Sequence, residues 1–97
     1  MTDAEINLAI AKIEFAGKEL YQCADHVDVR LGAGDYTCVD YCNNWEDIGP
    51  IIEREGIELE VLNFGWSAGG YHLGVTATAE TPTKAAAMCY LRMKGVE

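Results

Sequence analysis

The chain has 97 residues, of which 49% are apolar, and a formal net charge of −9 at pH 7. This length suits one domain with a single modest core, and this apolar content argues against intrinsic disorder, so we expect residues 1–97 to form one domain. No apolar run approaches the ~20 residues of a membrane span, and the polar N-terminus does not resemble a signal peptide. We therefore expect a cytoplasmic protein whose four cysteines are free thiols.

The negative charge is concentrated between Glu19 and Glu60. That segment holds eleven carboxylates and only two basic residues, Arg30 and Arg54, whereas the flanking segments are nearly balanced. A localised acidic field repels nucleic acid and anionic lipid, and it steers a protein toward basic surfaces. Because the chain has no basic stripe, we do not expect direct binding to nucleic acid. The alternative interpretation is a solubilising surface with no further role.

The first part of the chain predicts a helix followed by short strands. Thr2 and Glu5 match a capping box, and apolar residues then recur at helical spacing, which predicts a helix over about residues 3–15. Strands are expected over 20–23 and 27–31, because valine and leucine alternate with charged residues in the second of these runs.

A third strand is expected over residues 36–41, after a glycine-rich turn. Asn44 is a suitable N-cap for a short second helix, which Gly56 would end. Pro50 lies beyond the first turn of that helix, where proline removes a hydrogen bond at a cost of about 3 kcal/mol. We therefore predict a broken start, with regular helix only from about Pro50.

The last part predicts a hairpin and a final helix. Residues 57–62 alternate as a strand, 65–70 form a flexible glycine-rich turn, 71–78 are the returning strand, and 82–94 are helical. In the strand at 57–62, we expect the side chains of Ile57, Leu59 and Val61 to point inward. Together these elements predict an α+β fold: a small antiparallel sheet with the first and last helices packed on one face and the short middle helix at an edge.

The cysteines allow a zinc hypothesis, because Cys23-x-x-His26 and Cys38-x-x-x-Cys42 supply four ligands at spacings close to those of zinc fingers. No Cys-x-x-Cys knuckle is present to form half of such a site in advance. Cys89 has apolar neighbours and is interpreted as a core residue. We therefore expect no bound metal and no cofactor.

Catalysis is not expected either. A nucleophilic cysteine needs a cationic neighbour, yet all the cysteines except Cys89 lie in the acidic segment, where the pKa of a thiol rises. His72 lies within an expected strand and is interpreted as structural. The glycines at 32–34 and 69–70 lack the spacing and the Lys-Ser/Thr of a phosphate-binding loop.

Five segments carry a resemblance to a known family. They are DYCNN at 40–44, GPII at 49–52, EGI at 55–57, the closing helix at 81–94, and AEIN at 4–7. Together they resemble the NinX-like family of small bacteriophage proteins. The resemblance implies phage origin and implies no known activity.

Phage origin, small size and localised acidity resemble phage-encoded inhibitors of host defence, among them anti-CRISPR proteins that mimic DNA. This analogy predicts an inhibitor, acting in the bacterial host cytoplasm, that binds a basic nucleic-acid-binding host complex and blocks target-DNA binding. A type I CRISPR surveillance complex, with its long basic channel, is the first choice of partner. The expected partner-binding residues are Asp35, Asp40, Glu46, Asp47, Glu53, Glu58 and Glu60.

Two other functions remain open. One is an accessory module that binds a phage or host protein through Trp45, Trp66 and neighbouring aromatic residues. The other is an adaptor stabilised by zinc. Trp45 is also a departure from the family pattern, which leads us to expect proline after the paired asparagines.

Overall fold

The computed structural model describes residues 1–70 and 72–96, and its first element is a capped helix. Helix α1 spans Asp3–Glu14. The backbone N–H of Glu5 donates to Thr2 Oγ1 (3.2 Å), and the Glu5 carboxylate accepts from the N–H of Thr2 (2.9 Å). Each bond satisfies an N–H group that the first turn of a helix leaves free, so the predicted capping box is confirmed.

The predicted meander is confirmed as a three-stranded antiparallel sheet in the order β1-β2-β3. Its strands are β1 (Leu20–Gln22), β2 (Val27–Gly32) and β3 (Asp35–Val39). Val27 and Val29 are fully buried on the face that packs against α1. Leu31 does not continue this alternation and is 46% exposed, because the register shifts between Arg30 and Gly32.

Helix α2 spans Trp45–Glu55 without a break at Pro50, so the predicted broken start is wrong. Gly49 explains part of this, because the ring of a proline clashes with the Cβ of a helical residue before it and glycine has none. Ile48 and Ile51 are buried on either side of Pro50, so core packing holds both halves of the helix in line. The predicted caps are confirmed: Asn44 Oδ1 accepts from the N–H of Glu46, and a left-handed Gly56 ends the helix.

The second antiparallel sheet has the order β4-β5-β6. Its strands are β4 (Glu58–Leu62), β5 (Gly65–Gly69) and β6 (Thr76–Ala79). The glycine-rich run predicted as a turn is therefore the central strand, and the returning strand begins at Thr76. A Cβ added at Gly69 would lie 2.6 Å from the carbonyl oxygen of Val75, so here glycine permits close approach of two backbones. Tyr71, where the returning strand was predicted to begin, lies outside the described residues.

Helix α3 spans Pro82–Met93 and packs against the second sheet as well as against α1 and α2. Because it is covered on several sides, most of its residues are buried: Thr83, Ala85, Ala86, Ala87, Cys89, Tyr90 and Leu91. The small side chains of the three alanines favour close packing against the sheet, where Ala68 of β5 and Ala77 of β6 are also buried. The predicted core position of Cys89 is confirmed.

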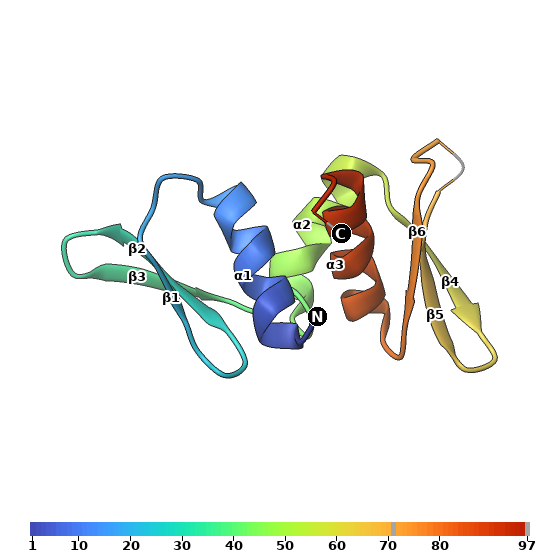
Figure 1. Cartoon of the computed structure of the whole chain (residues 1–97), viewed down its shortest axis with the longest axis horizontal. Coiled ribbons are helices and arrows are strands. Elements are labelled where there is room, and N and C mark those ends of the chain that lie inside the picture. The colour runs from blue at the N-terminus through green and yellow to red at the C-terminus, as the bar shows by residue number, and fades with distance from the viewer. Residues whose placement is uncertain (71, 97) are drawn as a thin grey trace.

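The two sheets lie at opposite ends of the molecule, with the three helices between them (Figure 1). The molecule measures 45 × 24 × 22 Å. The predicted α+β class is confirmed, but the strands form two sheets instead of one. Helix α1 packs on the first sheet, α3 packs on the second, and α2 packs on α3 instead of at a sheet edge.

One hydrophobic core joins these layers, and it includes Ile10 of α1, Ile48 of α2 and Leu91 of α3. Val61, which was predicted to face inward, is 66% exposed, because it lies near the outer end of the β4–β5 hairpin. Among the described residues, no helix has the length and apolar character needed to cross a membrane.

Candidate functional site

The turn between β3 and α2 is organised by Asn7, which is fully buried on α1. Asn7 Nδ2 donates to Asp40 Oδ1 (3.0 Å), and Asn7 Oδ1 accepts from the N–H of Cys42 (3.1 Å). Asp47 Oδ2 accepts from the N–H of Asp40 (2.9 Å). Asp40 and Asp47, two of the predicted partner-binding residues, therefore have hydrogen-bond partners within the protein and help to fix this turn.

The same turn is tied to the start of α3. Thr83 Oγ1 donates to the carbonyl oxygen of Cys42 (2.6 Å), and Lys84 Nζ lies 2.8 Å from Asp3 Oδ1. This lysine lowers the pKa of the Asp3 carboxyl, mainly through their hydrogen bond. Asn43 Nδ2 also donates to Asp3 Oδ2 (3.4 Å). The turn thus connects α1, α2 and α3.

The other five predicted carboxylates are exposed: Asp35, Glu46, Glu53, Glu58 and Glu60. Across residues 1–70 and 72–96, none of these five side chains has an ion pair or a hydrogen bond. The two arginines of the acidic segment are engaged elsewhere: Arg54 pairs with Glu14 and Glu55, and Arg30 pairs with Glu19. The five carboxylates are therefore available to an external cation.

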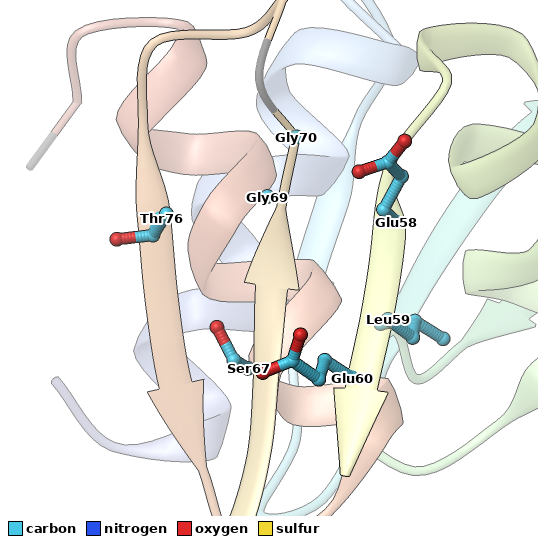
Figure 2. A pocket seen from close by; sticks show the side chains of 7 residues that line it. All are labelled: Glu58, Leu59, Glu60, Ser67, Gly69, Gly70 and Thr76. Carbon is cyan, nitrogen blue, oxygen red and sulfur yellow. The ribbon is translucent and has the colours of Figure 1, made fainter. Parts of the chain in front are cut away.

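Two of these carboxylates lie on the outer face of the second sheet (Figure 2). Glu60 is directly opposite Ser67 of β5, and Glu58 is in register with Gly69 and, through it, with Thr76 of β6. Together they line an open hollow of about 570 Å³. Leu59 points away from Glu58 and Glu60 (Figure 2), as strand alternation requires. With two carboxylates, two hydroxyls and no basic residue in its lining, the hollow suits the side chain of a partner's lysine or arginine.

The five free carboxylates are distributed along the length of the molecule. Asp35 begins β3 in the first sheet, Glu46 and Glu53 lie on α2, and Glu58 and Glu60 lie on β4 in the second sheet. In Figure 1, β3 and β4 lie at opposite ends of the long axis. These charges therefore follow the long dimension of 45 Å and are not gathered in one cluster.

Comparison with protein families decides the origin of this chain. The family model described as "Bacteriophage P22, NinX" matches residues 1–94. The chain belongs to this phage family. Neither the comparison with curated proteins nor the comparison with solved structures found a match.

In this NinX-family protein, the motif at residues 40–44 coincides with the turn that Asn7 and Asp47 hold. The paired asparagines have two different functions there: Asn43 contacts Asp3 and Asp40, and Asn44 caps α2. Trp45, which follows the paired asparagines, is the first residue of α2 and is 53% exposed. The motif is therefore primarily a structural junction of the fold.

The structure separates the four ligands of the zinc hypothesis. Cys42 is buried beside α1, where burial raises the pKa of its thiol to about 12. Cys23 and His26 instead lie together with Asp28, and one ligand atom from each residue lies within 4.8 Å of the others. Cys38 is directly opposite Asp28 across β2 and β3. Sequence reasoning missed Asp28, although strand alternation from His26 could have placed it on the same face.

Exposed aromatic residues form a second feature of the NinX-family protein. Phe64, at the β4–β5 turn, is 81% exposed, whereas Trp66 is partly buried against the core. Sequence reasoning named Trp66 and missed Phe64, because the hairpin turn was not predicted at that position. Trp45 on α2 and Phe64 at the tip of the second sheet are thus exposed aromatic side chains, as are Tyr21 and Tyr36 on the first sheet.

Proposed function

We propose that this phage protein is an acidic inhibitor that binds the nucleic-acid-binding surface of a host defence complex. It acts in the bacterial cytoplasm, binds stoichiometrically, and catalyses no reaction. A type I CRISPR surveillance complex is its first proposed target, and blocked binding of target DNA is the proposed effect. The observation that carries this proposal is the set of five exposed carboxylates that have no ion pair or hydrogen bond within the described part of the chain: Asp35, Glu46, Glu53, Glu58 and Glu60.

Charge and shape support this proposal in a quantitative way. A duplex carries one phosphate charge per about 1.7 Å, so 45 Å of B-DNA carries roughly 26 charges. The protein has a net charge of −9 over a length of 45 Å, which is about one third of that density. It would therefore replace a subset of phosphates in a basic channel, and we propose that each free carboxylate contacts a lysine or arginine there.

The test is a competition experiment with purified surveillance complex and labelled target DNA, observed by gel shift. The parent protein should release DNA at a near-stoichiometric ratio. The double variant Glu58→Gln/Glu60→Gln should compete less well, because it lacks two carboxylates of the outer sheet face. The matched control Glu19→Gln/Glu55→Gln has the same net charge but removes carboxylates that already pair with arginines. Circular dichroism verifies that all three proteins are folded.

Comparison of the two double variants shows whether inhibition depends on Glu58 and Glu60 in particular or only on the net charge of the protein. If both lose the same amount of inhibition, overall charge is responsible and the proposed contacts are wrong. If the parent does not release DNA from the complex at all, mimicry at this target is excluded.

A second candidate function is supported by the exposed aromatic residues. Phe64 and Trp45 suit an accessory module that binds a phage or host protein through apolar contacts. In that case Phe64→Ser should weaken partner binding strongly, whereas Glu58→Gln/Glu60→Gln should alter it little. The mimicry proposal predicts the reverse order for the two variants.

A further inference from the structure

The Cys23–His26 segment is a tight hairpin that brings two metal-binding side chains together. Cys23 directly follows β1, His26 directly precedes β2, and the N–H of Cys23 donates to the carbonyl oxygen of His26 (2.9 Å). Only two residues separate them, as in the knuckles that hold zinc in small domains. The Cys-x-x-His hairpin thus holds two possible metal ligands close together, as a Cys-x-x-Cys knuckle would.

Asp28 adds a third donor to this hairpin. Its Oδ1 lies 3.3 Å from His26 Nε2, and its Oδ2 lies 3.8 Å from Cys23 Sγ. One donor atom from each of Cys23, His26 and Asp28 falls within 4.8 Å of the others, although these side chains are only partly buried. Sulfur, imidazole nitrogen and carboxylate oxygen form a donor set typical of zinc.

Asp25 gives the imidazole the orientation that a metal ligand needs. His26 Nδ1 lies 2.8 Å from Asp25 Oδ1, on the opposite side of the ring from Nε2. A carboxylate that accepts the Nδ1–H of a histidine fixes its tautomer and directs the Nε2 lone pair outward, which is the usual outer-shell arrangement at zinc sites. Here Nε2 lies 3.3 Å from Asp28 Oδ1 and belongs to the cluster that includes Cys23.

Cys38 lies across from this cluster of three donors on the neighbouring strand, and it supplies a fourth donor once its side chain turns toward the cluster. It pairs with Asp28 in the register of β2 and β3, so the two side chains project from the same face of the sheet. Side chains opposite each other in this way have Cβ atoms about 5 Å apart. Cys38 is exposed and its thiol is free, so neither packing nor a disulfide prevents it from turning toward the cluster.

We propose that Cys23, His26, Asp28 and Cys38 form a zinc-binding site on the outer face of the first sheet. This site replaces the ligand set suggested by sequence spacing, because Asp28 takes the place of the buried Cys42. On binding, zinc forms bonds to Cys23 Sγ, Cys38 Sγ, His26 Nε2 and a carboxylate oxygen of Asp28. The two thiols lose their S–H bonds and release two protons to solvent, and a third proton leaves if His26 was protonated. The site is independent of the proposed inhibitory function.

The test uses the full chain, kept reduced and freed of metal, and titrated with Co²⁺ and then with Zn²⁺. Cobalt bound by two thiolates should give a thiolate-to-metal charge-transfer absorption at one equivalent, and zinc should displace it. Zinc binding should also release about two protons per equivalent, measured with a pH indicator in weak buffer. Absence of a charge-transfer band at one equivalent would overturn the proposal.

Variants identify the ligands. Cys23→Ser and His26→Gln should each weaken zinc binding by at least tenfold in competition with a chromophoric chelator. Cys38→Ser should lose about half of the charge-transfer intensity, because one thiolate remains. The control His72→Gln changes the other histidine, which lies beyond β5, and should bind zinc as the parent does. Parent-like binding by Cys23→Ser or His26→Gln, or undiminished absorption by Cys38→Ser, would contradict the assigned ligand set.

Discussion

Asn7 Nδ2 donates a hydrogen bond of 3.0 Å to Asp40 Oδ1, which joins the first helix to the turn that leads into α2. The side-chain oxygen of the same amide accepts from the N–H of Cys42, so both ends of a fully buried group are satisfied. Replacing it therefore affects two partners at once.

Asn7→Ala should destabilise the protein by about 1–3 kcal/mol, because it leaves the N–H of Cys42 and one oxygen of Asp40 without this partner. Urea unfolding followed by circular dichroism measures the change. Gln22→Ala, which truncates an exposed amide on β1, is the control and should stay within about 0.5 kcal/mol of the parent. Equal effects from the two variants would exclude a structural function for Asn7.

Glu14 should make stability depend on pH in the acid range. Arg54 donates to both of its carboxylate oxygens (2.9 and 3.0 Å) and Tyr90 Oη donates to one, so the pKa of Glu14 is lowered from its ordinary value of 4.5. A lowered pKa in the folded state stabilises the protein above pH 4.5, and this contribution disappears as the pH falls through the folded-state pKa. Glu14→Gln should therefore be less stable than the parent at neutral pH.

The difference between the parent and Glu14→Gln should shrink progressively below pH 4.5. Unfolding free energies measured at several pH values from about 3 to 7 test this. Glu60→Gln removes one carboxylate that has no ion pair or hydrogen bond among residues 1–70 and 72–96, and it controls for the change in net charge. A gap between the parent and Glu14→Gln that is the same at every pH would show that the Arg54 contact is not the cause.

Leu91 tests the shared core. It is fully buried on α3, as Ile10 is on α1, so Leu91→Ala should destabilise by about 2–5 kcal/mol through lost burial and a residual cavity. Glu58→Gln, on the outer face of the second sheet, should stay within about 0.5 kcal/mol. Thermal and denaturant unfolding measure both changes. Similar shifts in unfolding free energy for the two variants would contradict the burial of Leu91 in the shared core.

Gly49 tests why α2 is continuous through Pro50. In an ordinary helix interior, glycine to alanine stabilises by roughly 0.5–1 kcal/mol. Here we expect Gly49→Ala to destabilise, because the new Cβ would meet the ring of Pro50. The double variant Gly49→Ala/Pro50→Ala should recover stability, since it removes the ring. A simple gain in unfolding free energy from Gly49→Ala alone would refute this explanation.

Salt should control partner binding if the free carboxylates replace phosphates. Affinity of the parent for its basic partner should fall steeply between about 50 and 200 mM salt. Glu58→Gln/Glu60→Gln should show a shallower dependence, whereas Glu19→Gln/Glu55→Gln should match the parent. Fluorescence anisotropy at several salt concentrations provides the slopes. Identical slopes for all three proteins would place Glu58 and Glu60 outside the interface.

Local signals in the sequence predicted much of this fold. The capping box at Thr2 and Glu5, the caps Asn44 and Gly56, and the proline at the start of α3 each act within one turn of chain. Each therefore marked a helix end correctly. The α+β class and the first meander followed from the same kind of local pattern.

Features that depend on distant contacts were not predicted. The glycine run of β5 was interpreted as a turn, because only its neighbours β4 and β6 show why Gly69 must be small. The division into two sheets depends on which helix covers which strands, and no local pattern encodes that. The inward position of Val61 was wrong for the same reason, since the core does not extend to the end of its hairpin.

The candidate site was predicted in part. Sequence reasoning identified exposed acids correctly at Asp35, Glu46, Glu53, Glu58 and Glu60. It could not show that Asn7, far away in sequence, engages Asp40. The use of the five exposed acids as partner contacts stays a prediction.

The packing of α1 against α3 has a consequence for how the chain folds. Every strand pairs with a neighbour in sequence, so both sheets can form through short loops. The first and last helices, by contrast, meet only after almost the whole chain has been brought together. Bringing the two ends of the chain together costs loop-closure entropy that the local hairpins do not incur. We therefore expect docking of α1 onto α3 to limit the folding rate, and a chain that lacks either terminal helix to retain local hairpins without a stable core.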